Sequence, residues 1–161
     1  MDRRRVREQV AQRKADILAA HAPLPGITDF IDRGAELGLQ LGVASNSERC
    51  KVERDLDRLA LRQRFSAIRC AEDVDETMPD PALYFSVCDA MNVSPTESIA
   101  IQSSPDGIVS AKGAGLYCIS VPDRVTGSVS MDNADLVLVS LAAITLDEVV
   151  ERASRQADST N

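Results

Sequence analysis

Residues 99–107 read Ile-Ala-Ile-Gln-Ser-Ser-Pro-Asp-Gly, the pattern of a buried strand that runs directly into a helix. The apolar residues favour the strand, and Ser104 followed by Pro105 has the residue types of a helix start. The free N–H groups of a helix N-terminus can bind an anion. Gln102 and Ser103 are uncharged, however, and cannot hold a divalent cation as carboxylates would. The stretch therefore predicts an anion site that lacks acidic residues.

Strand and helix patterns alternate along the chain. The expected strands are residues 39–44, 65–70, 98–102, 116–121 and 136–139, and the expected helices are 3–20, 26–37, 48–60, 81–91 and 105–114. The later strands are nearly continuous apolar runs, which is typical of a parallel sheet covered on both faces. The predicted fold class is α/β, with a mostly parallel sheet and helices on both faces.

The composition is that of an ordinary globular protein. The chain has 161 residues, with 44% hydrophobic and 27% charged side chains, which fits one domain. No apolar run is long enough to span a bilayer, and no secretory signal pattern follows the start, so a cytoplasmic location is the default expectation.

The cysteines and the single histidine do not form a metal-site pattern. Four widely spaced cysteines are expected to act as small core residues: Cys50, Cys70, Cys88 and Cys118. His21 precedes Ala22-Pro23, and we interpret it as the end of a helix, where the helix dipole favours a cation.

Three segments, in this order, carry a family resemblance. They are Leu-Gly-Val-Ala-Ser-Asn-Ser at 41–47, Met-Pro-Asp-Pro at 78–81, and Ile-Gln-Ser-Ser-Pro-Asp-Gly at 101–107, with Ala114-Gly115 behind the last. They resemble the second, third and fourth motifs of the haloacid dehalogenase (HAD) superfamily, in its phosphoglycolate phosphatase and β-phosphoglucomutase branch. The resemblance implies a Rossmann-like core over residues 22–150. Residues 1–21 would be a helix left from the cap domain, and residues 151–161 a flexible tail.

The first motif of that superfamily is not found. The resemblance implies a first strand ending in Asp-x-Asp-x-(Thr/Val), whose first aspartate attacks phosphorus while magnesium bridges the two acids. No such strand precedes residue 23, so we expect the fold to lack its first strand and most of its cap. Residues 73–77 spell Asp-Val-Asp-Glu-Thr, but no buried strand ends at Asp73. We interpret them as a solvated acidic loop.

Internal positions also depart from the family pattern. Met78 stands where the family has a lysine, and Gln102 and Ser103 stand where it has the magnesium-holding Glu-Asp pair. The nucleophile, the lysine and the metal each stabilise the transition state of phosphoryl transfer by an amount on the order of several kcal/mol. Each 1.4 kcal/mol corresponds to about a tenfold change in rate. No catalytic residue, metal ligand or cofactor is therefore predicted in this chain.

Three residues are candidates for phosphate or anion binding: Ser45, Asn46 and Ser104. By resemblance, Ser45 takes the place of the second-motif hydroxyl that hydrogen-bonds the transferred phosphoryl group. A serine at a strand end is also an ordinary turn residue. The sequence leaves both interpretations open.

The sequence supports two alternative hypotheses about function. The preferred hypothesis is a degenerate HAD-like hydrolase domain that is inactive in magnesium-dependent phosphoryl transfer and acts by binding or assembly. The alternative is a HAD-family phosphatase or phosphomutase-like hydrolase that is a fragment, a two-chain enzyme, or an enzyme rewired near Ser45, Gln102 and Ser103. The sequence names no ligand.

A missing central strand has a structural consequence. By resemblance, it would lie between the strand ending at Ser45 and the strand ending at Gln102. Unpaired strand edges are costly, so we expect either direct pairing of these two strands or another segment in the gap, from a homodimer or a partner chain. Residues 1–21 are candidates to cover the opening or to dimerise. Their six basic and three acidic side chains favour a solvated helix face over nucleic-acid contact, and no membrane partner is expected.

Overall fold

The computed structural model describes residues 23–122, 131 and 133–159. The helices are α2 (Ile27–Glu36), α3 (Arg49–Arg58), α4 (Ala82–Met91), α5 (Pro105–Ala114) and α6 (Leu146–Ser159). The strands are β1 (Gly42–Ala44), β2 (Ala67–Arg69), β3 (Ile99–Gln102), β4 (Tyr117–Ser120) and β5 (Leu136–Val137). The α/β class is confirmed. The expected helix over 3–20 and His21 lie outside the described residues.

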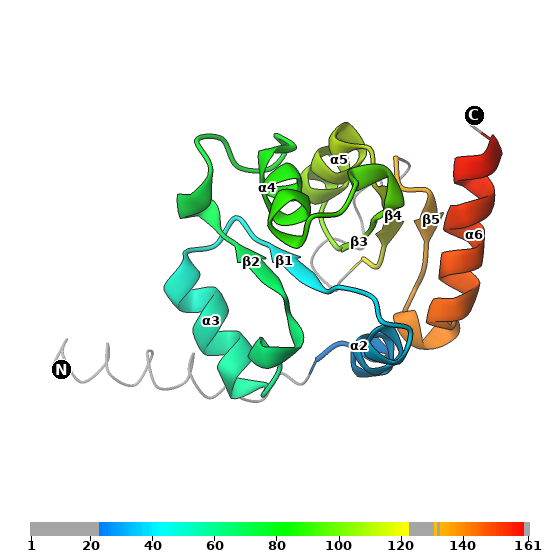
Figure 1. Cartoon of the computed structure of the whole chain (residues 1–161), viewed down its shortest axis with the longest axis horizontal. Coiled ribbons are helices and arrows are strands. Elements are labelled where there is room, and N and C mark those ends of the chain that lie inside the picture. The colour runs from blue at the N-terminus through cyan, green and yellow to red at the C-terminus, as the bar shows by residue number, and fades with distance from the viewer. Residues whose placement is uncertain (1–22, 123–130, 132, 160–161) are drawn as a thin grey trace, which may run out of the picture.

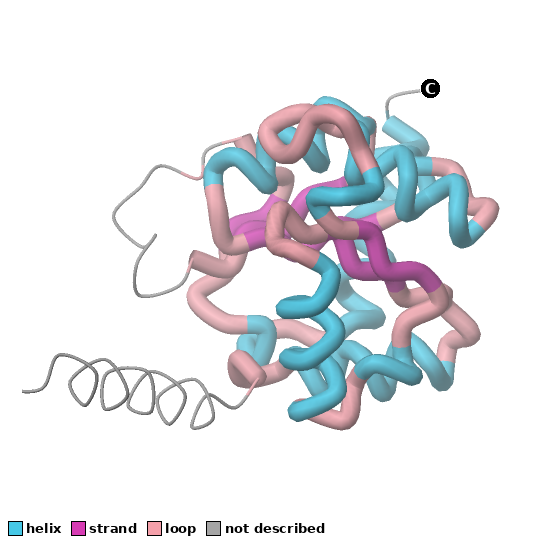
Figure 2. Tube along the Cα trace, turned by 90° about the vertical axis from the view of Figure 1, so that its left-hand side faces the viewer, coloured by secondary structure: helices cyan, strands magenta, loops and turns pink. Residues whose placement is uncertain are grey.

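All strand pairs are parallel, as predicted, and they form two separate sheets in the described part of the chain. One sheet has the order β1-β2 and the other has the order β3-β4-β5. Figure 1 shows α4 and α5 on one side of the strands, α2 and α3 on the other, and α6 alongside β5. Figure 2 shows the strands as a central layer between helices. Helices therefore cover both faces, as the apolar strand pattern predicted.

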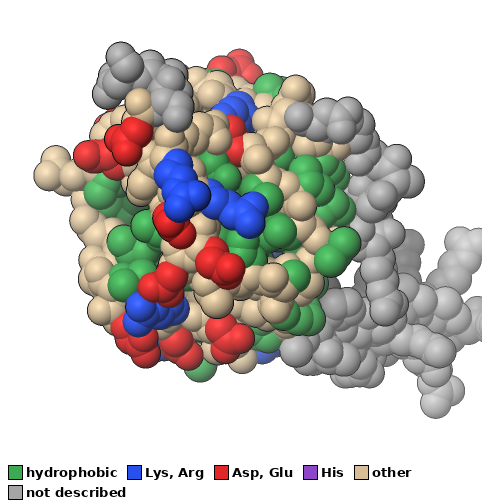
Figure 3. Space-filling view, turned by 90° about the vertical axis from the view of Figure 1, so that its right-hand side faces the viewer, with side chains coloured by type: hydrophobic (Ala, Val, Ile, Leu, Met, Phe, Trp, Pro, Cys, Tyr) green, Lys and Arg blue, Asp and Glu red, His purple; other side chains and the backbone are tan. Residues whose placement is uncertain are grey.

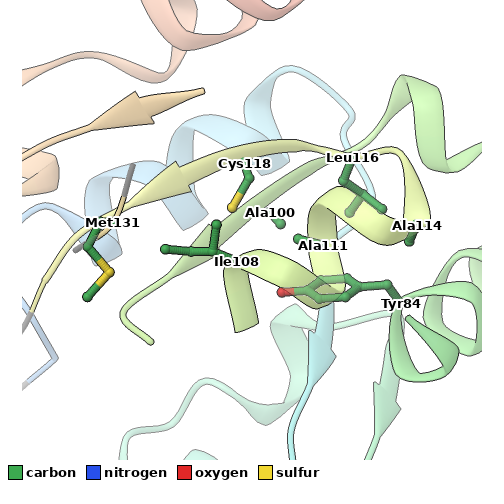
Figure 4. Packing of buried hydrophobic residues seen from close by; sticks show 8 residues of the cluster. All are labelled: Tyr84, Ala100, Ile108, Ala111, Ala114, Leu116, Cys118 and Met131. Atoms are coloured by element: carbon green, nitrogen blue, oxygen red, sulfur yellow. The ribbon is translucent and has the colours of Figure 1, made fainter. Parts of the chain in front are cut away.

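Strand β4 faces two hydrophobic clusters. Cys118 belongs to a cluster with residues of α4 and α5 (Figure 4), and the next residue, Ile119, belongs to a second cluster with residues of α2 and α6. Both side chains are fully buried. Because successive strand side chains point to opposite faces, this burial on both sides explains the continuous apolar run in the sequence.

The helix ends follow the local sequence. Helix α5 begins after Ser104, whose Oγ accepts a hydrogen bond from Gly107 N at 3.2 Å, and Pro105 occupies its first turn. It ends at Gly115, which has a φ of 89°, and α4 ends at Asn92, which has a φ of 54°. These left-handed conformations suit glycine and asparagine. The predicted start and stop of α5 are confirmed.

The strands that end near Ser45 and Gln102 do not pair, so the expectation of direct pairing is wrong for the described residues. Strand β1 pairs only with β2, and β3 pairs only with β4. Helix α4 packs on β1 and β2, α5 packs on β3 and β4, and the two helices contact each other. By resemblance the family's first strand would lie between β1 and β3, and in the described residues the two strand pairs stay separate, as they would on either side of such a strand.

The two strands beside this opening are incompletely covered. Ile101 of β3 is 38% exposed, and Val43 of β1 is only half-buried, whereas Cys118 and Ile119 of the neighbouring β4 are fully buried. The second expectation, that another segment occupies the opening, is not tested by the described residues and stays a prediction.

The chain beyond residue 145 differs from the expectation. Residues 151–161 were expected to be a tail, but α6 extends through Ser159. Thr145 and Glu148 start this helix: Glu148 N donates to Thr145 Oγ1, and Thr145 N donates to Glu148 Oε2. This is a Thr-x-x-Glu capping box, which stabilises a helix N-terminus. Figure 3, which faces the side that carries α6, shows acidic and basic side chains interspersed with hydrophobic ones.

The cysteine prediction holds for three of the four residues. Cys70, Cys88 and Cys118 are buried, but Cys50 on α3 is exposed, so the core assignment is wrong there. Helix α3 has no fully buried residue, because its apolar stripe is only half covered. Within the described ranges, no helix is long and apolar enough to cross a membrane.

Candidate functional site

The three motif segments meet around one hydrophobic cluster. Ala44, which precedes Ser45, and Met78 both pack against the cluster that contains Tyr84 of α4 and Ile108 of α5. Ser45 follows β1, and Ser103 follows β3. Ligands of parallel α/β sheets bind beyond the carboxyl ends of strands, which is where these segments lie. The fold therefore brings the second, third and fourth motif segments to one region.

Ser45 is fixed by backbone hydrogen bonds. Its N–H donates to the carbonyl oxygen of Arg69 at 3.0 Å, and its Oγ accepts from Ser47 N at 3.1 Å. Because the hydroxyl oxygen is used as an acceptor, its hydrogen stays available to donate to a ligand. Helix α3 then starts after Glu48, without a side-chain cap.

Asn46 ties the second motif segment to the third. Its Nδ2 donates to the carbonyl oxygen of Met78 at 3.2 Å, and Met78 N donates to its Oδ1 at 2.9 Å. The side chain thus holds the backbone at Met78 through both ends of its amide. Its role in the described residues is to position this loop, and only one amide hydrogen remains for a ligand.

Gln102 is held inside the interface between α4 and α5. Its Nε2 donates to the hydroxyl of Tyr84, a side chain that is 6% exposed. Its Oε1 lies against Gly107 of α5, where an added Cβ would be 2.1 Å from that oxygen. Burial raises the pKa of Tyr84 to about 12, although the hydrogen bond from Gln102 lowers it, so the phenol stays neutral. The position that resembles a metal ligand is therefore a neutral packing contact.

The start of α5 has few free donors. Pro105 has no N–H, Gly107 N donates to Ser104 Oγ, and Ile108 N donates to the Ser104 carbonyl oxygen at 3.1 Å. The N–H of Asp106 is therefore the donor of this turn left without an intrahelical partner among the described residues. The hydroxyl hydrogen of Ser104 is also available, because its oxygen accepts from Gly107.

The residues present do not fit magnesium. The family pattern needs carboxylates where this chain has Gln102 and Ser103, and the amide of Gln102 is already bound to Tyr84. Across residues 23–122, 131 and 133–159, no group of three or more His, Cys, Asp or Glu side chains could hold a metal ion.

Asp73, the first residue of the acidic segment at 73–77, has a structural role. Asp73 accepts a hydrogen bond from Cys70 N at 2.7 Å and pairs with Arg49 of α3. The backbone hydrogen bond and then the ion pair lower the pKa of its carboxyl group, although desolvation opposes them. Residues 71–73 form a single 3-10 turn and no strand ends at Asp73, which confirms the prediction of a loop.

Sequence reasoning missed the role of Tyr84. Tyr84 lies within the helix expected over 81–91, and no partner is predicted for its hydroxyl. A signal was present, because the hydroxyl of a buried tyrosine usually needs a hydrogen-bond partner and the chain contains only two tyrosines.

Comparison with known proteins identifies the family. The haloacid dehalogenase-like hydrolase family matches residues 2–121. The chain belongs to this family. Its relatives include proteins named Hexitol phosphatase B and CbbY. The predicted resemblance is confirmed.

Two curated relatives of this HAD-family chain are phosphatases by name. It is 33% identical over 150 residues to "Putative phosphatase YhcW" of Bacillus subtilis, covering 93% of this chain and 66% of the relative. It is 29% identical over 150 residues to Hexitol phosphatase B of Escherichia coli, covering 92% of this chain and 68% of the relative. The chain therefore spans about two thirds of these relatives, and we describe it as a phosphatase-like hydrolase domain by family.

Solved structures agree with the assignment. CbbY from Rhodobacter sphaeroides in complex with phosphate is similar with a TM-score of 0.68 and 30% identity, over 74% of this chain and 54% of that chain. β-Phosphoglucomutase from Clostridium difficile shares the fold, with a TM-score of 0.74 at 21% identity over 83% of this chain and 57% of that chain.

Proposed function

We propose that this HAD-family domain binds a small anion at the carboxyl ends of β1 and β3 and does not catalyse magnesium-dependent phosphoryl transfer. Ser45, Asn46 and Ser104 are its proposed anion-binding residues. In this proposal the domain acts by binding or assembly.

The observation that carries the proposal is the placement of Gln102. A metal ligand has to present an oxygen to the site, but this side chain is bound to Tyr84 and packed against Gly107. Ser103 beside it has no carboxylate, and Met78 has no cation to neutralise a phosphate group. These substitutions are internal, so they support the proposal independently of any segment outside residues 1–161.

Magnesium binding tests the proposal directly. Isothermal titration of the purified chain with MgCl2, with and without inorganic phosphate, is expected to show no saturable metal binding. The variant Gln102→Glu/Ser103→Asp is expected to gain binding, because it restores two carboxylates. Magnesium binding by the wild-type chain that Ser103→Ala reduces would contradict the proposal.

A second candidate is a hydrolase of the phosphatase class. Similarity alone favours it, since YhcW and Hexitol phosphatase B are both named as phosphatases. The nucleophile and the other catalytic groups of the family pattern would then come from a longer polypeptide, from a second chain, or from a rewired site near Ser45. Hydrolysis of phosphate esters by the chain together with the protein segment encoded next to it would favour this candidate over the first.

We also propose that an extended segment from outside the described residues occupies the opening between β1 and β3. Both strands have an unpaired edge there in the described residues, and Ile101 is 38% exposed. Adding a strand would pair these edges and cover that side chain. A homodimer or a partner chain can supply it, and light scattering of the native gene product distinguishes the two from a monomer.

A further inference from the structure

We infer that the opening between β1 and β3 binds an uncharged polypeptide strand in which large and small apolar side chains alternate, and that this strand has a sequence outside residues 1–161. The inference rests on the proposed occupation of the opening and specifies the occupant. A strand bound there would join the β1-β2 and β3-β4-β5 sheets of the described residues into one.

Both strands direct backbone groups into the opening. Ser45 N, directly after β1, donates to a carbonyl oxygen of β2 at 3.0 Å, and the carbonyl oxygen of Gln102 accepts from the residue after β4 at 2.7 Å. Successive residues of a strand direct their N–H and C=O groups to opposite neighbours, so Ala44 and Ile101 direct theirs into the opening. No described strand pairs with these edges. An extended chain would pair with both edges at once.

The face of the opening below α4 and α5 has room only for small side chains. Ala44 and Ala100 pack into the hydrophobic cluster on this face. An added Cβ at Gly42 of β1 would lie 2.5 Å from Val87 Cγ1 of α4, so the helix lies close to the strand. Because α4 packs on β1, α5 packs on β3 and the two helices contact each other, they close over the opening.

The opposite face, on the side of α2, leaves apolar side chains uncovered. Successive strand side chains point to opposite faces, so Val43 and Ile101 point to this side. Leu41, two residues before Val43, has its Cδ2 beside Gly34 of α2. Ile101 is 38% exposed and Val43 is half-buried. Large apolar side chains on the occupant would cover both residues.

The occupant has no charge to pair with. Strand β1 reads Gly-Val-Ala and strand β3 reads Ile-Ala-Ile-Gln, so neither contains a charged residue. A charged side chain buried between them would lose its hydration without a compensating partner. The two faces therefore select an uncharged strand with large apolar residues at every second position and small ones between them.

The undescribed segments of this chain do not have that pattern. Residues 1–22 contain one apolar run of four, Ile-Leu-Ala-Ala at 17–20, which would put one large side chain on each face. In residues 123–130 the two apolar side chains, Val125 and Val129, are four positions apart. Residues 132 and 160–161 are too few to form a strand. A second copy has the same segments, so the occupant has a different sequence.

Two synthetic peptides of the same composition test the inference on the full-length chain. One has the core Ile-Ala-Ile-Ala-Ile, the other has the core Ile-Ile-Ile-Ala-Ala, and both are flanked by lysines for solubility. Amide hydrogen exchange is followed by NMR at Ala44 and Ile101, with Ser45, whose N–H already donates to β2, as the internal reference. We expect the alternating peptide to bind at least several-fold more tightly and to slow exchange at Ala44 and Ile101 more than at Ser45.

The other outcomes separate this inference from the proposed occupation of the opening. Equal affinities for the two peptides, with slower exchange at Ala44 and Ile101, would overturn the alternating pattern and leave the occupation intact. If neither peptide slows exchange there, the occupation itself is wrong and the inference falls with it. Light scattering of the chain alone is expected to show a monomer. An oligomer in which both amides are already protected would show that a second copy fills the opening and would overturn the inference.

Two lysine variants provide the matched control. Ile101→Lys puts an ammonium group on the uncovered face and is expected to abolish binding of the alternating peptide. Val139→Lys adds the same charge at a side chain that is 92% exposed, and it is expected to leave peptide binding unchanged. Equal losses of binding in the two variants would show that the peptide responds to net charge only and would contradict docking in the opening.

Discussion

At the residue scale, the contact between Gln102 and Tyr84 explains why this site is neutral. The side chain that resembles a metal ligand by position is a donor to a buried phenol. The half-buried amide of Gln102 stabilises the α4–α5 interface through this hydrogen bond, so the residue has a packing role that does not need catalysis.

Removing the phenol hydroxyl should therefore cost stability. Tyr84→Phe leaves the half-buried amide of Gln102 without its acceptor, and we expect the free energy of unfolding to fall by about 0.5–1.5 kcal/mol, measured by urea denaturation. The matched control is Tyr117→Phe, at a half-buried tyrosine, which should cost less than about 0.5 kcal/mol. Equal losses would show that the Gln102 contact contributes nothing specific.

A methyl group at Gly107 should displace the end of the Gln102 side chain and so break its contact with Tyr84. In Gly107→Ala the added Cβ would meet Gln102 Oε1 at 2.1 Å, so a loss of about 1–3 kcal/mol is expected in the same assay. In Gly113→Ala on the same helix the nearest atom is 3.7 Å away, and a gain of about 0.5–1 kcal/mol is expected. If Gln102 is the cause, Gln102→Ala combined with Gly107→Ala should recover most of the loss.

At the element scale, Asp135 joins three elements. It accepts hydrogen bonds from Cys118 N of β4, Lys112 Nζ of α5 and Gln156 Nε2 of α6. Burial raises the pKa of its carboxyl group, but the three hydrogen bonds outweigh burial and hold the pKa below its usual range. One carboxylate therefore fastens helices on both faces of the sheet to its middle strand.

This arrangement predicts a pH dependence. Because the folded-state pKa of Asp135 lies below the unfolded value, its stabilisation is complete above the unfolded pKa of about 3.9 and is lost as the pH falls through the folded pKa. Asp135→Asn should lower the free energy of unfolding by about 1.5–3 kcal/mol at pH 7, and the difference from wild type should shrink below about pH 4. A difference that is constant from pH 7 to pH 3 would contradict this account.

The opening between β1 and β3 can be tested with one charge. If a strand covers Ile101, Ile101→Lys should cost more than about 1 kcal/mol or dissociate the assembly, because it buries an unpaired ammonium group. Val139→Lys, at an exposed side chain, serves as the control and should stay within about 0.5 kcal/mol of wild type. Unfolding by urea and mass by light scattering report both effects. If neither substitution changes the stability or the mass of the protein, the opening is unoccupied.

At the scale of the whole molecule, the sequence predicted the alternation of strands and helices because burial on both faces leaves continuous apolar strands. It also located the segments at Ser45, Met78 and Gln102, which the fold brings to one region. It predicted a separation of the two strand pairs only as one of two alternatives, because the residue pattern does not show whether the strands on either side of a missing strand close up. It missed α6, although Thr145 and Glu148 have capping-box spacing.

The central claim is that this HAD-family domain does not perform magnesium-dependent phosphoryl transfer. Its most direct test is the rate of release of inorganic phosphate from a generic phosphate ester, with and without MgCl2, for the wild-type chain and for Ser45→Ala. We expect no magnesium-dependent release above the Ser45→Ala background. Magnesium-dependent hydrolysis by the wild-type chain that Ser45→Ala abolishes would contradict the account.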